Sequence, residues 1–387
     1  MQRAISQNRI YLDYNATAPC RPETRRAFMA AARRCWGNAS SAYREGREAR
    51  RFLEEARRQV AGAIGAEPSE IVFTSGGTEA DTMALTSTGM ERRALIVSSI
   101  EHHAVMEPAR ELARMGARLE LAGCDADGIV SAAVVRSMLT PDMSFVSVML
   151  VNNETGAIQP VVEIARAARE AGALCHTDAV QALGKIAVDV RQLNVDMLAL
   201  SSHKLGAPKG IGALFIRNGI VCRPLLRGGP QERGLRAGTE NVPAIAAFGV
   251  AAELVTRNMA VEQGRIRALR DLLWERLAGA CPGILRNGSV ESCVANTLNI
   301  SFPGLDGPTL MMARDGGGIA VSTGAACAVG AAEPSHVLEA MCFGRDRCRG
   351  SLRFSLGYGT TAQEIGRVAD VVPRLVQRMR ENRGATR

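Results

Sequence analysis

One lysine stands out among the residues whose type and position could support chemistry. The chain has three lysines against forty-four arginines, and arginine does not lose its proton in proteins. Lys204 follows the apolar run 195–200 and precedes the glycine-rich stretch 205–212. A partly desolvated lysine at the end of a buried strand can lose a proton and attack a carbonyl carbon to form a Schiff base. The alternative is a solvated loop lysine, and residues at neighbouring strand ends must decide between the two.

Three polar residues at other predicted strand ends suit a lysine that holds an aldehyde on an aromatic ring. Asp178 follows the predicted strand 173–177, and a carboxylate there could keep a pyridine nitrogen protonated. The alternative is that Asp178 caps a helix that begins after it. His102 and Asn153 follow two further strands, where they could stack on the ring and donate to its oxygen. Ligands of open α/β sheets bind at this carboxyl edge of the strands.

A phosphate group could bind where the segment 71–80 passes from a strand into a helix. Two glycines separate these elements, and backbone N–H groups at a helix N-terminus bind phosphate. A tight turn without any ligand is the alternative for this segment. Ser201 and His203, which lie beside the lysine, add hydroxyl and imidazole donors that a phosphate would use.

Cys327 lies in the run 322–332, which consists of small residues and includes two glycines. Small side chains give little burial to hold a loop in place, and glycine permits large backbone excursions. We therefore expect a thiol that can enter a pocket and leave it, although a buried cysteine in a tightly packed loop is the alternative. The other nine cysteines form no C-x-x-C pair or Cys/His cluster, which indicates reduced thiols in a cytoplasmic protein.

Short apolar runs alternate with helical patterns through the first two-thirds of the chain. This alternation predicts βα units around a largely parallel sheet that is covered on both faces. After about residue 250 the pattern changes to a smaller α+β region, with a long arginine-rich helix at 251–280 and a capping box at 361–364. The predicted strands are 71–74, 94–98, 118–121, 145–151, 173–177, 195–200, 212–217, 297–301 and 351–355.

Composition limits the possible function classes. The chain has 387 residues, which suggests about two domains, and 47% of them are apolar. The net charge of +8 could indicate nucleic acid, but the arginines are spread along helices such as 45–64 and aromatics are only 4%. We therefore expect no nucleic-acid partner. The N-terminus lacks the apolar core of a signal peptide, and no apolar run approaches the roughly 20 residues of a membrane span.

Taken together, these strings resemble one family. The chain is similar to the pyridoxal-phosphate-dependent cysteine desulfurases, of the iron–sulfur-assembly and nitrogen-fixation type, within the class V aminotransferase superfamily. The resemblance covers nearly the whole chain in the expected order. It rests on YLDYNAT (11–17), GNASS (37–41), TSGGTE (74–79), EH (101–102), VNNETG (151–156), HTDAVQ (176–181), SSHK (201–204), RGLRAGT (233–239), GAAC (324–327), EPSH (333–336) and SLRFS (351–355).

The resemblance implies an α/β fold of the aspartate-aminotransferase-like type, known as fold type I. A large cofactor-binding domain with a mainly parallel seven-stranded sheet is expected at 15–255. A smaller α+β domain, formed by 1–14 and 256–387, would carry the cysteine loop 322–332.

The resemblance also assigns the site residues. Lys204 would hold pyridoxal phosphate and Asp178 would pair with its ring nitrogen. Arg353 and Asn153 would bind the substrate. The Arg353 guanidinium suits the substrate carboxylate, because it can donate two parallel hydrogen bonds to it. The remaining cofactor contacts would be His102 on the ring, Asn153 and Gln181 near the phenolic oxygen, Gly77, Thr78, Ser201 and His203 on the phosphate, and Thr239 on the phosphate of the partner subunit in a homodimer.

The implied reaction removes sulfur from L-cysteine and leaves L-alanine. Lys204 would act as the base at Cα, His102 would donate or accept protons, and the Cys327 thiolate would take the sulfur as a persulfide. That persulfide would then meet an iron–sulfur scaffold or another acceptor, with transient contact to the metal cluster at Cys327. The alternatives are a selenocysteine lyase or an aminotransferase of the same superfamily, or an RNA-binding or scaffold protein that only keeps the fold.

Two departures from the family pattern are clear. Tyr43 stands where relatives commonly have histidine, and the cysteine loop is alanine-rich at 325–328. The sequences of the cysteine loop and of the stretch 78–81 resemble the nitrogen-fixation branch of the family more than the other branch.

Overall fold

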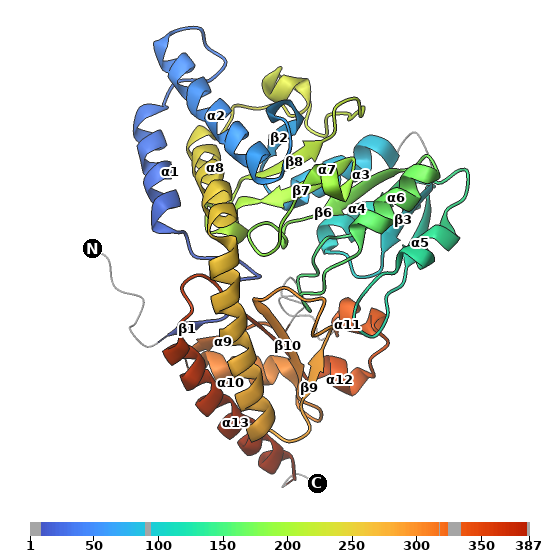
Figure 1. Ribbon diagram of the computed structural model, residues 1–387, viewed down its shortest axis with the longest axis vertical. Coiled ribbons are helices and arrows are strands. Elements are labelled where there is room, and N and C mark those ends of the chain that lie inside the picture. Colours follow the sequence, from blue (N-terminus) through green and yellow to red (C-terminus); the bar gives the residue numbers. More distant parts are fainter. Residues whose placement is uncertain (1–8, 90–93, 317, 324–333, 385–387) are drawn as a thin grey trace.

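The structure is a computed structural model that describes residues 9–89, 94–316, 318–323 and 334–384. The described residues form three sheets, of which β1 (Ile10–Tyr11) and β11 (Ile319–Ala320) make the smallest. The other two organise the fold, and Figure 1 shows the seven-stranded sheet above the three-stranded one. The seven strands of the larger sheet are β2 (Ile71–Thr74), β3 (Ala94–Ser98), β4 (Arg118–Ala122), β5 (Phe145–Ser147), β6 (Leu174–Asp178), β7 (Met197–Ser201) and β8 (Gly212–Ile216). Their order across the sheet is β2-β8-β7-β6-β5-β3-β4.

Only β8 runs against its neighbours in this sheet. It pairs antiparallel with β2 and β7, and all the other pairs are parallel, so the prediction of a mainly parallel sheet is confirmed. The predicted strand 145–151 was too long, because β5 pairs with β3 only as far as Ser147. Beyond that point Val148 and Leu150 donate backbone hydrogen bonds only to the β6 side.

Helices cover both faces of the large sheet. They are α1 (Pro22–Arg34), α2 (Arg44–Ala63), α3 (Gly77–Gly89), α4 (His103–Arg114), α5 (Ala132–Met138), α6 (Val161–Glu170), α7 (Val190–Leu193) and α8 (Val242–Arg257). Successive strand residues point to opposite faces. Ile71 and Phe73 of β2 therefore share a core with α2, α8, α5 and α6. Val72 packs with α3 on the other face, where α4 covers β3 and β5.

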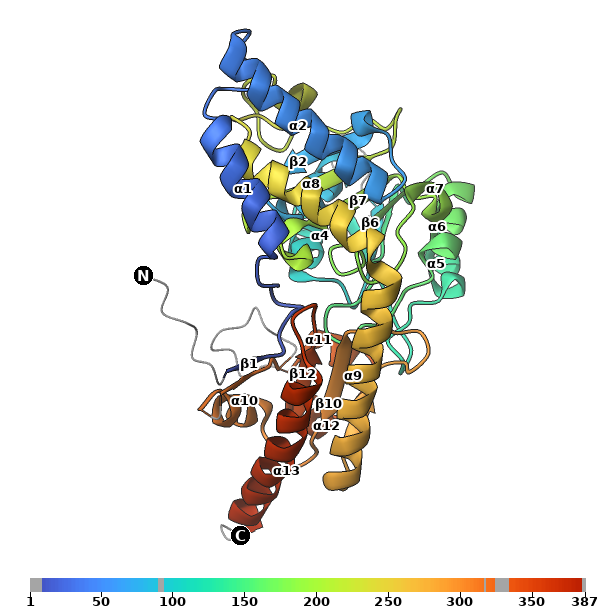
Figure 2. The same ribbon diagram turned by 60° about the vertical axis from the view of Figure 1, so that its left-hand side comes forward.

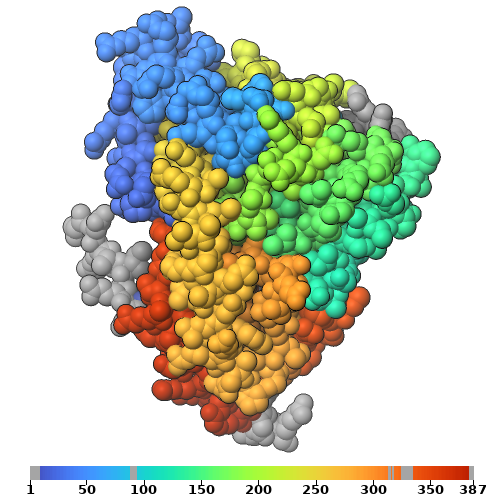
Figure 3. All heavy atoms as spheres, viewed as in Figure 1, coloured from blue at the N-terminus to red at the C-terminus, as the bar shows by residue number. Residues whose placement is uncertain are grey.

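The predicted helix 251–280 is in fact two helices. α8 ends at Arg257, and α9 (Met259–Ala280) begins after Asn258, where the axis bends by 73°. α8 packs against α1 and α2, whereas α9 descends beside the small sheet, and Figure 3 shows this pair along one face of the molecule. No single helix in the described ranges is long and apolar enough to cross a membrane; α8 and α9 meet that test only as a bent pair.

The small sheet has three antiparallel strands in the order β12-β10-β9. They are β9 (Leu285–Asn287), β10 (Thr297–Ser301) and β12 (Ser351–Ser355). One face packs against α9 and the last helix, α13 (Ala362–Gly384), which lie side by side in Figures 1 and 2. Short elements complete this part: β1 (Ile10–Tyr11), β11 (Ile319–Ala320), α10 (Gly307–Gly316), α11 (His336–Ala340) and α12 (Arg345–Arg349).

The alternation along β12 decides which residues reach the large sheet. Leu352 and Phe354 enter the core with α9 and α13, so Arg353 projects from the opposite face of the strand. The capping box predicted at the start of α13 is confirmed, because Thr361 and Glu364 exchange backbone and side-chain hydrogen bonds. The domain division at 14/15 and 255/256 stays a prediction.

Candidate active site

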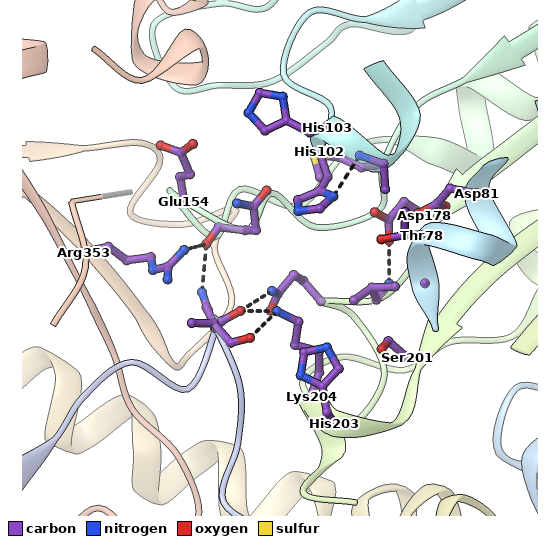
Figure 4. A pocket seen from close by; sticks show the side chains of 18 of the residues that line it. Thr78, Asp81, His102, His103, Glu154, Asp178, Ser201, His203, Lys204 and Arg353 are labelled. Atoms are coloured by element: carbon purple, nitrogen blue, oxygen red, sulfur yellow. Dashed lines mark hydrogen bonds between the residues drawn. The ribbon is translucent and has the colours of Figure 1, made fainter. Parts of the chain in front are cut away.

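A cavity of about 330 Å³ lies at the carboxyl edge of the large sheet, where Arg353 reaches it from the small sheet. Figure 4 shows its side chains converging from both parts of the chain. Ten of the residues that sequence reasoning singled out line it: Gly77, Thr78, His102, Asn153, Asp178, Gln181, Ser201, His203, Lys204 and Arg353. Their individual roles stay predictions, but their proximity is a property of the fold.

Lys204 lies in a 3-10 turn (Ser202–Leu205) that directly follows β7. The turn ends at Gly206, whose φ of 80° is left-handed and therefore suits glycine. The Lys204 Nζ atom donates to the carbonyl oxygens of Asn15 and Ala16, at 2.5 Å and 2.8 Å. These two backbone carbonyls hold the amine at the end of β7, where it faces the cavity.

Asp178 is the last residue of β6 and is almost completely buried. Its Oδ1 atom accepts a hydrogen bond from the Val180 N–H at 2.8 Å. The alternative that Asp178 caps a helix is wrong, because turns follow it rather than a helix. Burial raises the pKa of Asp178 to about 6, although the Val180 N–H and the Lys204 charge oppose this shift. The Val180 N–H and the Lys204 charge favour the ionised carboxylate, which can hold a protonated ring nitrogen.

The N-terminus of α3 forms one end of the cavity. The first N–H groups of a helix have no partners within the helix and attract anions. Gly77 is required there, because a Cβ atom at this position would lie 2.8 Å from a methyl group of Val180. Glu79 fixes the preceding turn by accepting from the Ser75 N–H and from the Arg236 side chain. This end of the cavity can bind a phosphate.

Two histidines complete the cavity wall. His203 approaches Thr17 through Nδ1 at 3.1 Å, and burial lowers its pKa to about 4. His102 caps α4 by accepting from the Ala104 N–H at 3.1 Å. Burial, followed by the charge of Lys204, lowers the pKa of His102 to about 4. Both rings are therefore neutral at physiological pH, and Figure 4 shows His102 projecting into the middle of the cavity.

Arg353 brings a guanidinium to the opposite end. Its side chain is 1% exposed and donates to the Asn153 carbonyl at 3.0 Å and to Asp13 at 2.7 Å. The Nε–H group has no partner among the described residues. A buried donor without a partner costs free energy, so this atom favours binding of a carboxylate from a ligand. A guanidinium is suited to bidentate binding of this kind.

Two predicted residues do not join this cavity. Thr239 lines a separate cavity of about 240 Å³ together with Ser75 and Arg236, so it does not reach the Lys204 cavity of its own chain. Cys327 lies outside the described residues, and its predicted role is therefore untested by the geometry.

Sequence reasoning missed several residues that line the Lys204 cavity. Most of them lie inside or next to the sequence motifs that carried the family resemblance, so these motifs could have been used to predict them. Asp81 follows Gly77 at helical spacing, so it shares the cavity face of α3. The missed polar residues are Asn15, Asp81, His103, Glu154 and His336.

A partly buried lysine, a buried carboxylate and a helix N-terminus around one cavity define an α/β enzyme for amine and carbonyl chemistry. The chain belongs to the class V aminotransferase family, whose sequence model matches residues 10–368. It is 44% identical to a cysteine desulfurase of Gluconacetobacter diazotrophicus, over 97% of this chain and 95% of that protein.

Solved structures agree with this family. A NifS-like protein superimposes with a TM-score of 0.90 at 34% identity, covering 95% of this chain and 99% of that chain. A structure described as SspA in complex with cysteine gives a TM-score of 0.80 at 32% identity, covering 90% and 98% respectively. The predicted superfamily and fold are thereby confirmed.

Proposed function

We propose that this protein is a pyridoxal-phosphate-dependent cysteine desulfurase, which removes sulfur from L-cysteine and releases L-alanine. The observation that carries the proposal is the convergence of Lys204, Asp178 and Arg353 with the α3 N-terminus on one cavity. The similarity over nearly the full chain to a protein named cysteine desulfurase supports the choice of substrate. So does the similarity to SspA, a protein whose structure contains cysteine.

The cavity fits pyridoxal phosphate in its donor set and in its volume. A volume of about 330 Å³ lies in the range of small-ligand sites. Gly77, Thr78, Ser201 and His203 would hold the phosphate, and Asp178 would hold the ring nitrogen. His102 would cover the ring face, while Asn153 and Gln181 would lie near the phenolic oxygen. When bound, pyridoxal phosphate supplies an aldehyde carbon for amines and a ring that withdraws electrons from the substrate Cα.

The protein's own groups then have separate tasks. Lys204 takes the proton from the substrate Cα, and the Asn15 and Ala16 carbonyls hold its amine in place. Arg353 holds the substrate carboxylate through its unpartnered Nε–H and the adjacent guanidinium hydrogens. His102 is neutral and its Nδ1 atom accepts from the Ala104 N–H, so its Nε2 atom carries a proton that it can donate near the reacting sulfur.

Cys327 receives the sulfur in this proposal. Its thiolate attacks the sulfur atom of the substrate, so that a sulfur–sulfur bond forms while the bond from sulfur to the substrate Cβ breaks. The resulting persulfide passes its outer sulfur to an acceptor protein, such as an iron–sulfur scaffold, and nitrogenase clusters are one destination. The reaction takes place in the cytoplasm, and any contact of Cys327 with a metal cluster is transient.

We also propose that the enzyme works as a homodimer. Thr239 lies outside the Lys204 cavity of its own chain, which supports a role at the phosphate of the partner subunit. Sedimentation of the purified protein as a dimer is the expected result, and Thr239→Ala should weaken pyridoxal phosphate binding without changing the rest of the cavity.

The decisive experiment combines mass spectrometry with two variants. After exposure to L-cysteine, the peptide that contains Cys327 should gain the mass of one sulfur atom. Cys327→Ala should keep the visible cofactor absorbance but release no sulfide in the presence of a reductant. Lys204→Ala should lose that absorbance. Undiminished sulfide release by Cys327→Ala would refute the assignment of the thiol, whereas amino transfer to a keto acid or a strong preference for selenocysteine would favour the alternative activities.

A further inference from the structure

Lys185 is the second lysine at this site, and sequence reasoning gave it no role. Its Nζ atom donates to the Oε1 atom of Gln181 at 2.6 Å and to the Oδ1 atom of Asn15 at 2.9 Å. The charged side chains of the site that act most strongly on it, Lys204 and Arg353, are both cationic. Burial and these two cations lower the pKa of Lys185 well below its usual value. Burial of an amine beside two cations costs free energy, which indicates that Lys185 has a role in the active site.

The amine fixes the orientation of the Gln181 side-chain amide. Whether protonated or neutral, the Lys185 amine offers N–H donors, and the Gln181 oxygen faces it and accepts from it. The Nε2 atom then faces the Asn15 carbonyl and donates to it at 2.9 Å. Because Gln181 is buried and lines the cavity, its second Nε2 hydrogen is the group that it can offer to a ligand. With a flipped amide, an acceptor would stand there instead.

The same amine also anchors Asn15, on which Lys204 rests. Asn15 is 2% exposed, and its backbone carbonyl accepts from both Gln181 and Lys204. Its side-chain oxygen accepts from Lys185 and from Asn296, at 2.9 Å each. Figure 4 shows the Lys204 amine with its hydrogen bonds to this backbone segment. The three bonds among Lys185, Gln181 and Asn15 close a ring, so loss of Lys185 removes two of the three and leaves the Gln181 oxygen without this donor.

We propose that Lys185 is a positioning residue of this active site, which holds the Gln181 amide and the Asn15 carbonyl so that an N–H donor faces the cavity beside Lys204. The inference rests on the proposed function, because that donor would meet the phenolic oxygen of bound pyridoxal phosphate. Without the donor, more negative charge stays on this oxygen, and the proton on the Lys204 nitrogen is held more strongly. The pH at which half of the protein has lost this proton, read from the visible absorbance of the bound cofactor, would then rise.

The test uses the full chain with Lys185→Met, which keeps the length of the side chain and removes its donors. We expect the dissociation constant of pyridoxal phosphate to rise about tenfold, as loss of one hydrogen bond to a charged group implies. The pH midpoint of the absorbance should rise by roughly one unit. Lys185→Arg, which keeps the donors, should recover much of both effects. Lys209 offers a matched control, because it is exposed, and Lys209→Met should change neither quantity.

A second variant protects the test against misfolding. Gln181→Met removes the proposed donor directly, so it should raise the midpoint by a similar amount. The double variant should show little beyond either single change, since both remove the same interaction. An unchanged midpoint in folded Lys185→Met or in Gln181→Met overturns the positioning role while the proposed function stands. Failure of the unmodified protein to bind pyridoxal phosphate overturns both.

Discussion

Replacing Glu101 by glutamine should stabilise the protein at neutral pH and have little effect at acidic pH. Glu101 is fully buried in the loop between β3 and α4, directly before His102. Its Oε1 atom accepts from Ser98 at 2.7 Å and from the Met149 N–H at 2.6 Å, whereas Oε2 has no partner among the described residues. This pattern fits a neutral carboxyl group, and the amide oxygen of glutamine can accept the same two hydrogen bonds.

The size of the effect follows from the titration of this group. Burial, reinforced by the nearby charge of Asp178, raises the pKa of Glu101 from 4.5 to about 8. In the unfolded chain the carboxyl ionises freely above its ordinary pKa, while the folded chain retains the proton. The raised pKa therefore makes the folded protein progressively less stable as pH rises from 4.5 towards 8. At pH 7 the cost is about 3 kcal/mol, since each unit is worth about 1.4 kcal/mol.

Chemical unfolding of both proteins between pH 4.5 and pH 8, at equal cofactor content, measures this difference. The stability of Glu101→Gln relative to the unmodified protein should rise by about 3 kcal/mol between pH 4.5 and pH 7. Glu111→Gln, which removes an exposed carboxylate, should give no gain that grows with pH. If the gain from Glu101→Gln were the same at both pH values, Glu101 would be ionised in the folded protein and the burial argument would be wrong.

Two further substitutions test the ends of the cavity. Gly77→Ala places a methyl group 2.8 Å from a valine side chain, so pyridoxal phosphate should bind roughly tenfold more weakly in an absorbance titration. Gly76→Ala meets no atom within 4 Å and should stay near the unmodified affinity; equal losses in both would contradict this. Arg353→Lys keeps the charge but loses the planar fork, so the KM for L-cysteine should rise roughly tenfold or more while kcat falls less. An unchanged KM in sulfide-release kinetics would remove Arg353 from substrate binding.

The sequence predicted the large sheet well because its signal is local. Apolar strands between glycine-rich turns and helical patterns are visible within about ten residues, and 71–74 and 94–98 match the observed strands to the residue. Errors arose where partners far away in the chain set the boundaries. The end of β5 depends on how far β3 extends beside it. The break at Asn258 depends on α8 packing against α1 and α2 while α9 packs beside the small sheet.

The active site also has features that the sequence predicted and contacts that only the structure shows. Lysine, aspartate and histidine at strand ends, together with glycines before a helix, were sufficient to predict the chemistry, because parallel strands place their carboxyl ends at one edge. The sequence alone gave no means of showing which groups would touch. Arg353 meets Asp13 across 340 positions, and Lys185 meets Asn15 across 170.

The sequence by itself therefore determined the covered parallel sheet, the family and the residue types of a lysine-centred site. Only the tertiary structure decided that Arg353 donates to Asp13 and to the Asn153 carbonyl, and that Lys185 donates to Gln181 and Asn15. The physical reason is that hydrophobic periodicity acts over a few residues. Hydrogen bonds and burial between distant segments, in contrast, exist only once the two sheets have packed together.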